Sequence, residues 1–294
     1  CMVQGGFDGY NIFDKQKSKM TDIAVRREFD DELNQGGVYG PTIAAFRKAV
    51  DVLSEKTDVD IQLLSIPGMR HPSITDYAID AVESRFDAMY IMDIEEKDQE
   101  NIFMTGSSTQ LPSVSYTVDN FKSRNLDTSF AAAYYPDVTV IDPNTRTTVQ
   151  VPPSVPVLGA FSLNDSIAYP WFAPAGFTRG ALASVIETQV KLSRPNMDTL
   201  YDANINPITS FADSNGVVVF GQKTLQTAQT ALDRVNVRRL LIEIRRRVRR
   251  IANTFIFEPN RAETLARFSS LITPVLQQIQ AQNTFGLPET LHKA

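Results

Sequence analysis

Apolar residues along the 294-residue chain occur either at helical spacing or in short unbroken runs, and the two patterns alternate. Beginning at Pro41, the stretch "PTIAAFRKAVDVLSEK" places Ile43, Phe46, Val50 and Leu53 three or four residues apart. This spacing lines one side of an α-helix with apolar side chains, and proline suits a first turn because its missing N–H would have no partner there. We therefore predict an amphipathic helix that begins near Pro41.

The stretches that follow predict a strand, a helix and a second strand. "VDIQLLSIPG" is a short apolar run closed by Pro-Gly, and "DAMYIMDI" is a second short run, so both are typical of buried strands. Between them, "SITDYAIDAVESRF" has helical spacing, and Ser73 with Asp76 resembles a capping box with Asp in place of the usual Glu. A strand, a helix and a strand within about 35 residues predict a right-handed βαβ unit.

The remainder of the chain predicts further strands and then two strong helices. We expect a polar connection with a third helix at 107–124, a third strand region at 130–142, a hairpin turn at 142–147, a helix at 181–191, a loop at 193–198, a strand at 215–225, helices at 236–253 and 261–282, and a strand or extended segment at 254–260. The predicted fold class is α/β (α+β), a mixed central sheet flanked by helices. Residues 1–35 are expected to form a glycine-rich, charged segment that is partly loop, and residues 36–294 one α/β core domain ending in two helices.

Composition argues against several classes of site. The net charge is −5 and the pI about 5.2, so the molecule as a whole is not built for polyanions. The single cysteine, Cys1, allows no internal disulfide, and with only His71 and His292 beside it a zinc site or a Cys/His catalytic pair is not expected. No apolar run approaches the roughly 18 residues of a membrane helix. We predict no catalytic residue, no metal, no cofactor and no membrane partner, and we interpret the paired acids in "DIEEKD" and "FDDEL" as charged surface.

The stretch "GVVVFGQKTL", residues 216–225, resembles a phosphate-binding loop without matching it. In that motif a lysine directly follows the second glycine, because the lysine and the backbone amides converge on one phosphate. Here Gln222 separates Gly221 from Lys223, and the residues between the glycines are three valines and a phenylalanine, which favour a strand. We interpret the stretch as a buried strand that ends in a turn at Gly221.

An arginine-rich helix is the most distinctive chemical feature. "NVRRLLIEIRRRVRRIANTF" holds seven arginines between Arg238 and Arg250, opposed only by Glu243. Apolar residues recur between them at helical steps and predict one apolar face opposite a basic face: Val237, Leu240, Leu241, Ile244, Val248, Ile251 and Phe255. Two interpretations stay open, an ordinary solvated face or a docking surface for an acidic partner, protein or nucleic acid. The helix carries no interleaved aromatic residues on which bases could stack, which favours an acidic protein over nucleic acid.

Several segments, in one order along nearly the whole chain, resemble the contractile tail sheath proteins of bacteriophages and related contractile injection systems. They are "GGFDGY", "VDIQLLSIPGM", "AAAYYPDVTVIDPNTRTTVQVPPS", "WFAPAGFTRG", "NPITSF...GVVVFGQKTL", "VNVRRL" and "FEPN". The resemblance identifies the following residues as structural motif positions: Gly5, Gly6, Asp8, Gly9, Pro174, Gly176, Gly221, Lys223, Thr224, Asn236, Arg238, Arg239, Glu258, Pro259 and Asn260. Within this set, Lys223 is expected to be structural.

The resemblance implies a structural protein that is not an enzyme. Sheath subunits stack as a helical lattice around a tail tube and contract to drive the tube through a target envelope, so the implied partners are neighbouring sheath subunits and the tube protein. The implied location is the virion tail, with the host cytoplasm during assembly, and the implied process includes genome ejection. Basic residues of a helix in this domain face the tube in the family, which assigns that role to Arg245, Arg246, Arg247, Arg249 and Arg250. The alternative is a nucleic-acid-binding protein that uses the same helix.

One departure from the family concerns the ends of the chain. Sheath proteins carry extended terminal arms that add strands to neighbouring subunits. Here "NTFGLPETLHKA" closes the sequence and little precedes "GGFDG". We therefore expect this chain to be a fragment without the polymerisation arms that behaves largely as a monomer, with an unpaired sheet edge as an aggregation risk.

Overall fold

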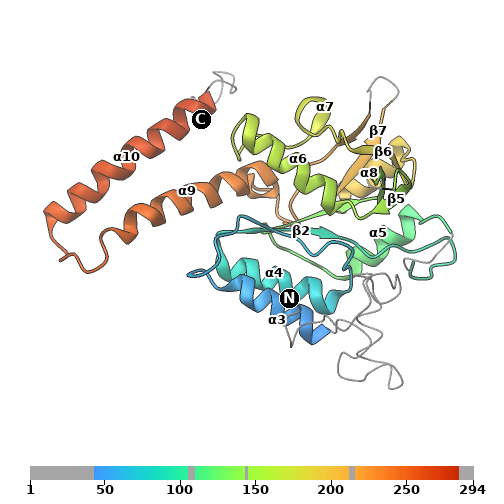
Figure 1. Cartoon of the computed structure of the whole chain (residues 1–294), viewed down its shortest axis with the longest axis horizontal. Helices are drawn as coiled ribbons and strands as arrows, with labels where there is room; N and C mark the ends of the chain where they lie inside the picture. The colour runs from blue at the N-terminus through green and yellow to red at the C-terminus, as the bar shows by residue number, and fades with distance from the viewer. Residues whose placement is uncertain (1–42, 105–109, 143–144, 212–215, 285–294) are drawn as a thin grey trace. The chain divides into compact units, whose positions relative to one another are not determined.

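The structure is a computed structural model, and it describes residues 43–104, 110–142, 145–211 and 216–284 (Figure 1). The chain divides into two compact units, Cys1–Arg239 and Leu240–Ala294, and helix α9 (Val235–Asn253) runs through the division. The predicted boundary near residue 35 lies outside the described residues.

A five-stranded sheet forms the centre of the first unit. Its strand order is β1-β2-β3-β7-β8; the first four strands are parallel, and β8 is antiparallel to β7. The strands are β1 (Leu63–Leu64), β2 (Met89–Asp93), β3 (Ala131–Tyr135), β7 (Ile205–Ser210) and β8 (Val217–Val219). Tyr90 pairs with Ala131, and Ala133 pairs with Ile205. The predicted strand-helix-strand unit is confirmed, although β1 is only two residues long.

Helices cover both faces of this sheet. Side chains of successive strand residues point to opposite faces, and β3 shows the consequence. Ala131, Ala133 and Tyr135 join an apolar cluster with helices on one face, whereas Tyr134 meets Phe161 of helix α6 edge to face at 6.3 Å. The helices of the first face are α3 (Ile43–Ser54), α4 (Pro72–Arg85), α5 (Val114–Ser123) and α8 (Arg194–Asp202), and α6 (Ser154–Ile167) lies on the other. Figure 1 shows α4 and α6 on opposite sides of β2.

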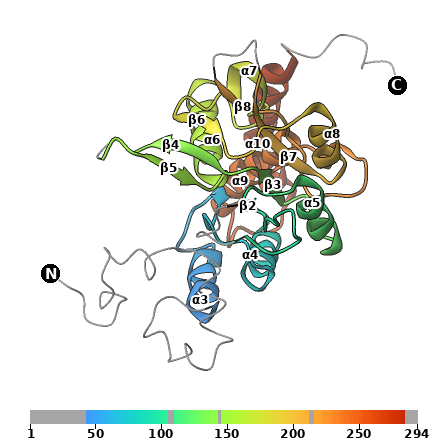
Figure 2. The same cartoon turned by 90° about the vertical axis from the view of Figure 1, so that its right-hand side faces the viewer.

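A smaller antiparallel sheet is inserted between β3 and β7. It has the order β5-β4-β6 and consists of β4 (Val138–Ile141), β5 (Thr148–Val151) and β6 (Val185–Thr188). The predicted hairpin between β4 and β5 is confirmed, with Val138 opposite Val151. Figure 2 shows this hairpin beside the five-stranded sheet. The mixed α/β class is therefore confirmed.

Three predictions for the first unit are wrong, and one of its helices was missed. Residues 181–191 contain strand β6 in place of a helix, because Val185 and Thr188 pair with β4. The predicted loop at 193–198 begins helix α8, with Ser193 Oγ accepting the Asn196 N–H at 3.4 Å and Pro195 in the first turn. Helix α6 was not predicted. Helix α4 begins at Pro72, and His71 Nδ1 accepts the Ser73 N–H at 3.2 Å, so Ser73 is not the cap.

The second unit contains the end of α9 and helix α10 (Ala262–Thr284). Both helices were predicted within two residues of their ends, but the segment between them forms turns and not a strand. The rings of Phe255 and Phe268 meet edge to face at 5.3 Å, and the Arg267 guanidinium lies 5.0 Å from the Phe255 ring. None of the helices in the described ranges is long and apolar enough to cross a bilayer.

Candidate functional site

Helix α9 buries arginines as well as apolar residues. Val235, Arg239, Ile242 and Arg246 follow one another at steps of three and four residues, and they are 0%, 3%, 4% and 8% exposed. This spacing places them on one side of the helix. The apolar residues of the predicted apolar face are half-buried, and Leu241 is 42% exposed. The helix is amphipathic as predicted, but its four buried residues lie on the side opposite the predicted apolar face, and two of them are arginines of the run.

Arg238 and Arg239, at the start of α9, are held by groups of the core. Arg239 Nη2 lies 2.5 Å from Asp165 Oδ2 of helix α6, and its guanidinium lies 5.0 Å from the Phe161 ring. Arg238 donates to Ser129 Oγ and lies 4.0 Å from the Phe130 ring. Desolvation lowers the pKa of Arg238. These contacts make the two motif arginines anchors of the helix in this unit.

The five arginines assigned to a partner surface are not equivalent. Arg246 is buried, and Arg247 Nε pairs with Glu243 Oε1 at 2.7 Å one turn away. Arg245, Arg249 and Arg250 are exposed. Three of the five side chains are therefore exposed, whereas Arg246 is buried and Arg247 is half-buried.

The turn after β8 is organised by Asn206 of β7, which sequence reasoning missed. Its side chain accepts the Lys223 N–H at 2.6 Å and donates to the carbonyl oxygens of Lys223 and Ala133, at 2.8 and 3.1 Å. A Cβ on Gly221 would lie 2.8 Å from Asn206 Oδ1, so only glycine fits there. Lys223 Nζ donates to the Tyr201 carbonyl at 2.9 Å, and buried Thr224 donates to Leu232. The contacts agree with a strand-and-turn interpretation and with a structural Lys223.

The "APAG" loop has a comparable steric constraint. Gly176 has φ +82° at the start of the short helix α7 (Gly176–Arg179), and Pro174 just before it is buried. A Cβ on Gly180 would approach Ala175 Cα to 2.7 Å. The positive φ accounts for glycine at 176, and the close backbone approach accounts for glycine at 180.

The other motif residues lie further along or outside the described ranges. Glu258 pairs with Arg267 at 3.1 Å, both partly exposed, and Pro259 and Asn260 are exposed beside it. Asn236 is half-buried in the first turn of α9. Gly5, Gly6, Asp8 and Gly9 lie outside the described residues, so their predicted place in a turn stays a prediction.

A buried charge cluster lies where the parallel strands end, and we call it the Arg70 cluster (Arg70, Asp93, Glu96 and Asp137). Arg70 Nη1 lies 3.0 Å from Glu96 Oε2, and Nη2 lies 2.5 Å from Asp137 Oδ1. Asp93, Glu96 and Asp137 are 1%, 4% and 7% exposed. The interpretation of "DIEEKD" as charged surface is therefore wrong, because Asp93 ends strand β2 and Glu96 follows it into the interior. The apolar run "MYIM" just before Asp93 was the available signal.

Burial determines the protonation of this cluster. Desolvation raises the pKa of Glu96 to about 7; Arg70 opposes the shift and Asp137 adds to it. Desolvation also raises the pKa of Asp93, against the opposing effects of Arg70 and of hydrogen bonds from Gly68 and Ser154. The neighbouring Tyr135 has its pKa raised by desolvation and by the two carboxylates, so it stays neutral.

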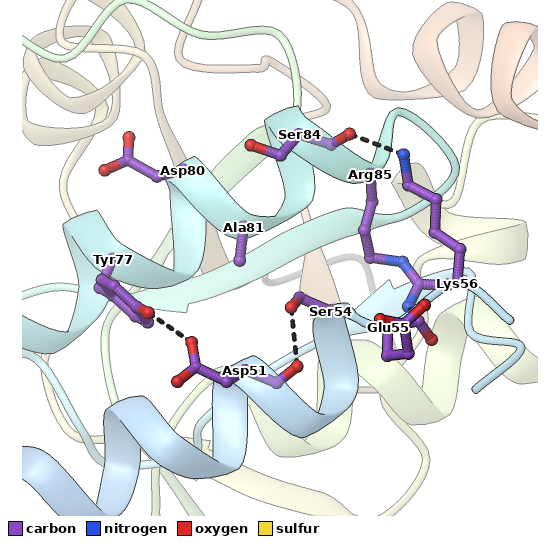
Figure 3. Close-up of a pocket in the computed structure, with 9 residues that line it drawn as sticks. All are labelled: Asp51, Ser54, Glu55, Lys56, Tyr77, Asp80, Ala81, Ser84 and Arg85. Atoms are coloured by element: carbon purple, nitrogen blue, oxygen red, sulfur yellow. Dashed lines mark hydrogen bonds between the residues drawn. The ribbon is translucent and has the colours of Figure 1, made fainter. Parts of the chain in front are cut away.

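A pocket between α3 and α4 is lined mainly by polar residues, several of which bind one another or the helix backbone (Figure 3). Tyr77 donates to Asp51 Oδ1, and Lys56 Nζ donates to the Ser84 carbonyl at 2.8 Å. Arg85 pairs with Asp87 at 2.9 Å and donates to the Leu53 carbonyl at the end of α3. These polar groups hold the two helices together. Over the described ranges, no group of three or more His, Cys, Asp or Glu side chains is arranged to hold a metal ion.

Comparisons with known proteins agree with this geometry. No family model matches the chain. It is 37% identical to the tail sheath protein of Vibrio phage KVP40 over 130 residues and 30% identical to that of Enterobacteria phage T4 over 172 residues. These matches cover 44% and 58% of this chain but 19% and 25% of the phage proteins. The matched region is thus a quarter or less of the length of these relatives.

Solved structures share the fold over most of the chain. A protein of the anti-feeding prophage baseplate superposes with a TM-score of 0.63 at 21% identity, covering 94% of this chain and 69% of that one. The sheath complex of an extracellular contractile injection system, in its contracted state, gives 0.61 at 24% identity, covering 89% and 65%. The sequence matches confirm the resemblance to contractile tail sheath proteins, and the structural matches confirm the fold.

Proposed function

We propose that this chain is part of a structural subunit of a contractile tail sheath, which surrounds a tail tube in the virion and contracts to drive the tube through the target cell envelope. The observation that carries the proposal is the 30–37% identity to phage tail sheath proteins. The partners in this proposal are neighbouring sheath subunits and the tube protein. Assembly would take place in the host cytoplasm.

The end of the parallel sheet supports a structural role over an enzymatic one. In open α/β sheets, ligands bind in the crevice outside the carboxyl ends of the strands. In this chain Asp93 stands at that end of β2, and its carboxylate accepts bonds from Gly68 N at 2.9 Å and from Ser154 N at 2.8 Å. Arg70 lies beside it and binds two further carboxylates. The chain's own side chains thus occupy the place where an α/β enzyme would hold its substrate.

Helix α9 supports a contact with an acidic partner. Arg245, Arg249 and Arg250 are exposed, and guanidinium groups pair well with carboxylates. Exposed charge pairs guide association and break readily, which suits an attachment that must be released when the sheath moves away from the tube. We therefore narrow the tube-facing set to these three residues, with Arg246 and Arg247 as supports of the helix.

The test combines assembly with charge reversal. The complete subunit that contains this sequence is expressed with its tube protein and viewed by electron microscopy. Sheathed tubes are expected from the unchanged subunit. The triple variant Arg245→Glu, Arg249→Glu, Arg250→Glu is expected to fold but to leave tubes bare. Normal sheathed tubes from the triple variant would refute the assigned contact.

A matched control reverses three exposed arginines elsewhere. Arg146, Arg194 and Arg261 are all exposed, and their conversion to glutamate changes the net charge by the same amount. This control is expected to assemble normally. Dispersed particles from the unchanged subunit with its tube protein would contradict the sheath proposal itself. In that event, a salt-titrated nucleic-acid binding assay tests the alternative, since affinity for a polyanion falls steeply as salt rises.

A further inference from the structure

The Arg70 cluster contains more buried acid than buried base. Three carboxyl groups, those of Asp93, Glu96 and Asp137, surround the single guanidinium of Arg70, and all three are less than a tenth exposed. With every group ionised, two negative charges would stay uncompensated in the interior. Burying an unpaired charge is costly, and a carboxyl group relieves that cost by taking up a proton.

The same cluster joins the two sheets of the first unit. Arg70 lies between β1 and α4, Asp93 ends β2, and Asp137 lies between β3 and β4. Asp93 binds both the backbone N–H and the hydroxyl of Ser154, at 2.8 and 2.7 Å, and so holds the first residue of α6. Gln150 of β5 donates to Asp137 Oδ2 at 3.0 Å. Changes in the charge of the cluster therefore act on the attachment of α6 and of the smaller sheet to the parallel sheet.

We propose that the Arg70 cluster is a proton-binding junction in which Glu96 takes up one proton and thereby strengthens the attachment of the smaller sheet and α6 to the core. Glu96 is the member best placed for this role. Asp93 accepts three hydrogen bonds from Gly68 and Ser154, and Asp137 accepts from both Arg70 and Gln150. The Glu96 carboxylate accepts from Arg70 at 3.0 Å and from the backbone of Asp137.

The groups around Glu96 determine whether its titration stabilises the fold at low pH or at high pH. The charged groups that act on Glu96 are Arg70 and Asp137. The other neighbours of the cluster are neutral: Gln150 of β5, Ser154 of α6, and Tyr135, which stays protonated. The pKa of Glu96 is raised from 4.5 to about 7 in the fold, so the folded chain holds this proton more tightly than the unfolded chain. The contribution of Glu96 to stability is therefore full at low pH, falls as the pH rises from about 4.5 to about 7, and is lowest above that range.

The experiment compares the whole 294-residue chain with its Glu96→Gln variant, which keeps the shape of the protonated acid. Urea unfolding is measured at several pH values from 5 to 8. The unfolding equilibrium constant of the wild type, divided by that of the variant, is expected to rise on the order of 50- to 100-fold over this range. Glu100→Gln, an exposed residue of the same stretch, is the matched control and is expected to show no such rise.

A second measurement protects the test against a misfolded variant. The ¹³C signal of the Glu96 side-chain carboxyl in the wild-type chain is followed from pH 4 to pH 9. A midpoint near 7 supports the proposal. A midpoint near the ordinary glutamate value, or a ratio of unfolding constants that stays level between pH 5 and pH 8, would overturn it.

Discussion

Arg239 at the start of α9 and Asp165 near the end of α6 form an ion pair with 2.5 Å between Nη2 and Oδ2. Arg239 is 3% exposed, whereas the Asp165 side chain is 28% exposed. In this pair, a buried guanidinium group binds a carboxylate that is partly exposed to solvent. Two residues 74 positions apart in sequence thus hold the first turn of the arginine-rich helix, which belongs to the first unit.

Removing Asp165 is expected to destabilise the chain more than removing an ordinary surface acid. Asp165→Ala leaves the buried Arg239 without its carboxylate. An unsatisfied buried polar group costs about 1–3 kcal/mol and a charged group more, so a loss of about 2–4 kcal/mol is expected. Urea unfolding at pH 7 measures the loss. Asp119→Ala, an exposed acid in α5, serves as the control and is expected to change stability by less than about 0.5 kcal/mol. Equal effects of the two substitutions would show that the pair does not stabilise the fold.

Two glycines are expected to respond in opposite directions to alanine. At Gly221 the new Cβ would lie 2.8 Å from Asn206 Oδ1 and 3.1 Å from Asn206 Cα, so the turn after β8 has to shift. We expect Gly221→Ala to cost about 1–3 kcal/mol, as overpacking does. Gly159 lies inside α6 with nothing within 4 Å of its added Cβ, and alanine there is expected to stabilise by about 0.5–1 kcal/mol. Thermal unfolding of both variants tests the contrast.

The parts of the fold that the sequence predicted are those with a regular apolar pattern. Helices α3, α4, α9 and α10 and strand β2 show clear periodicity or an unbroken apolar run. The mistaken region, 181–202, has neither. In β6, Val185 is buried and the next two residues are exposed, so the strand depends on its pairing with β4. Thr139 of β4, for example, pairs with Glu187, which is 48 residues further along the chain. Local patterns cannot report such distant pairing.

The candidate functional residues also divide into those that a local sequence pattern reveals and those that only the fold brings together. The arginine run was visible in the sequence, but the burial of Arg246 was not, because a helical pattern of charges does not reveal which side of the helix is buried. The Arg70 cluster was missed because its members come from three separate connections and meet only when the parallel strands end at one edge. Asn206 was missed because its partners, Lys223 and Ala133, are 17 and 73 residues away.

Asn206 is expected to be more important for stability than Lys223. Asn206→Ala removes a fully buried side chain that makes three hydrogen bonds and leaves the Lys223 N–H without its acceptor, so a loss of about 2–4 kcal/mol is expected. Lys223→Met removes one exposed bond to the Tyr201 carbonyl and the contact of Nζ with the Tyr201 ring, and is expected to cost less than about 1.5 kcal/mol. Chemical unfolding of the two variants gives the comparison. A larger loss for Lys223→Met would contradict the structural account of this turn.

The arginine run is expected to separate into folding and surface residues. Arg246 is 8% exposed, so Arg246→Glu places a carboxylate in a buried position that now holds a guanidinium, and a loss of at least about 3 kcal/mol is expected. Arg250 is exposed on the same helix, and Arg250→Glu is expected to stay within about 0.5 kcal/mol of the wild type. Urea unfolding curves of the two single variants, measured before any assembly assay, show which of the two arginines stabilises the fold. If the two variants are equally stable, Arg246 belongs with the surface residues and returns to the set that is proposed to face the tube. If they differ as expected, an assembly defect of Arg246→Glu reports on folding. Only Arg245, Arg249 and Arg250 then report on the contact with the tube.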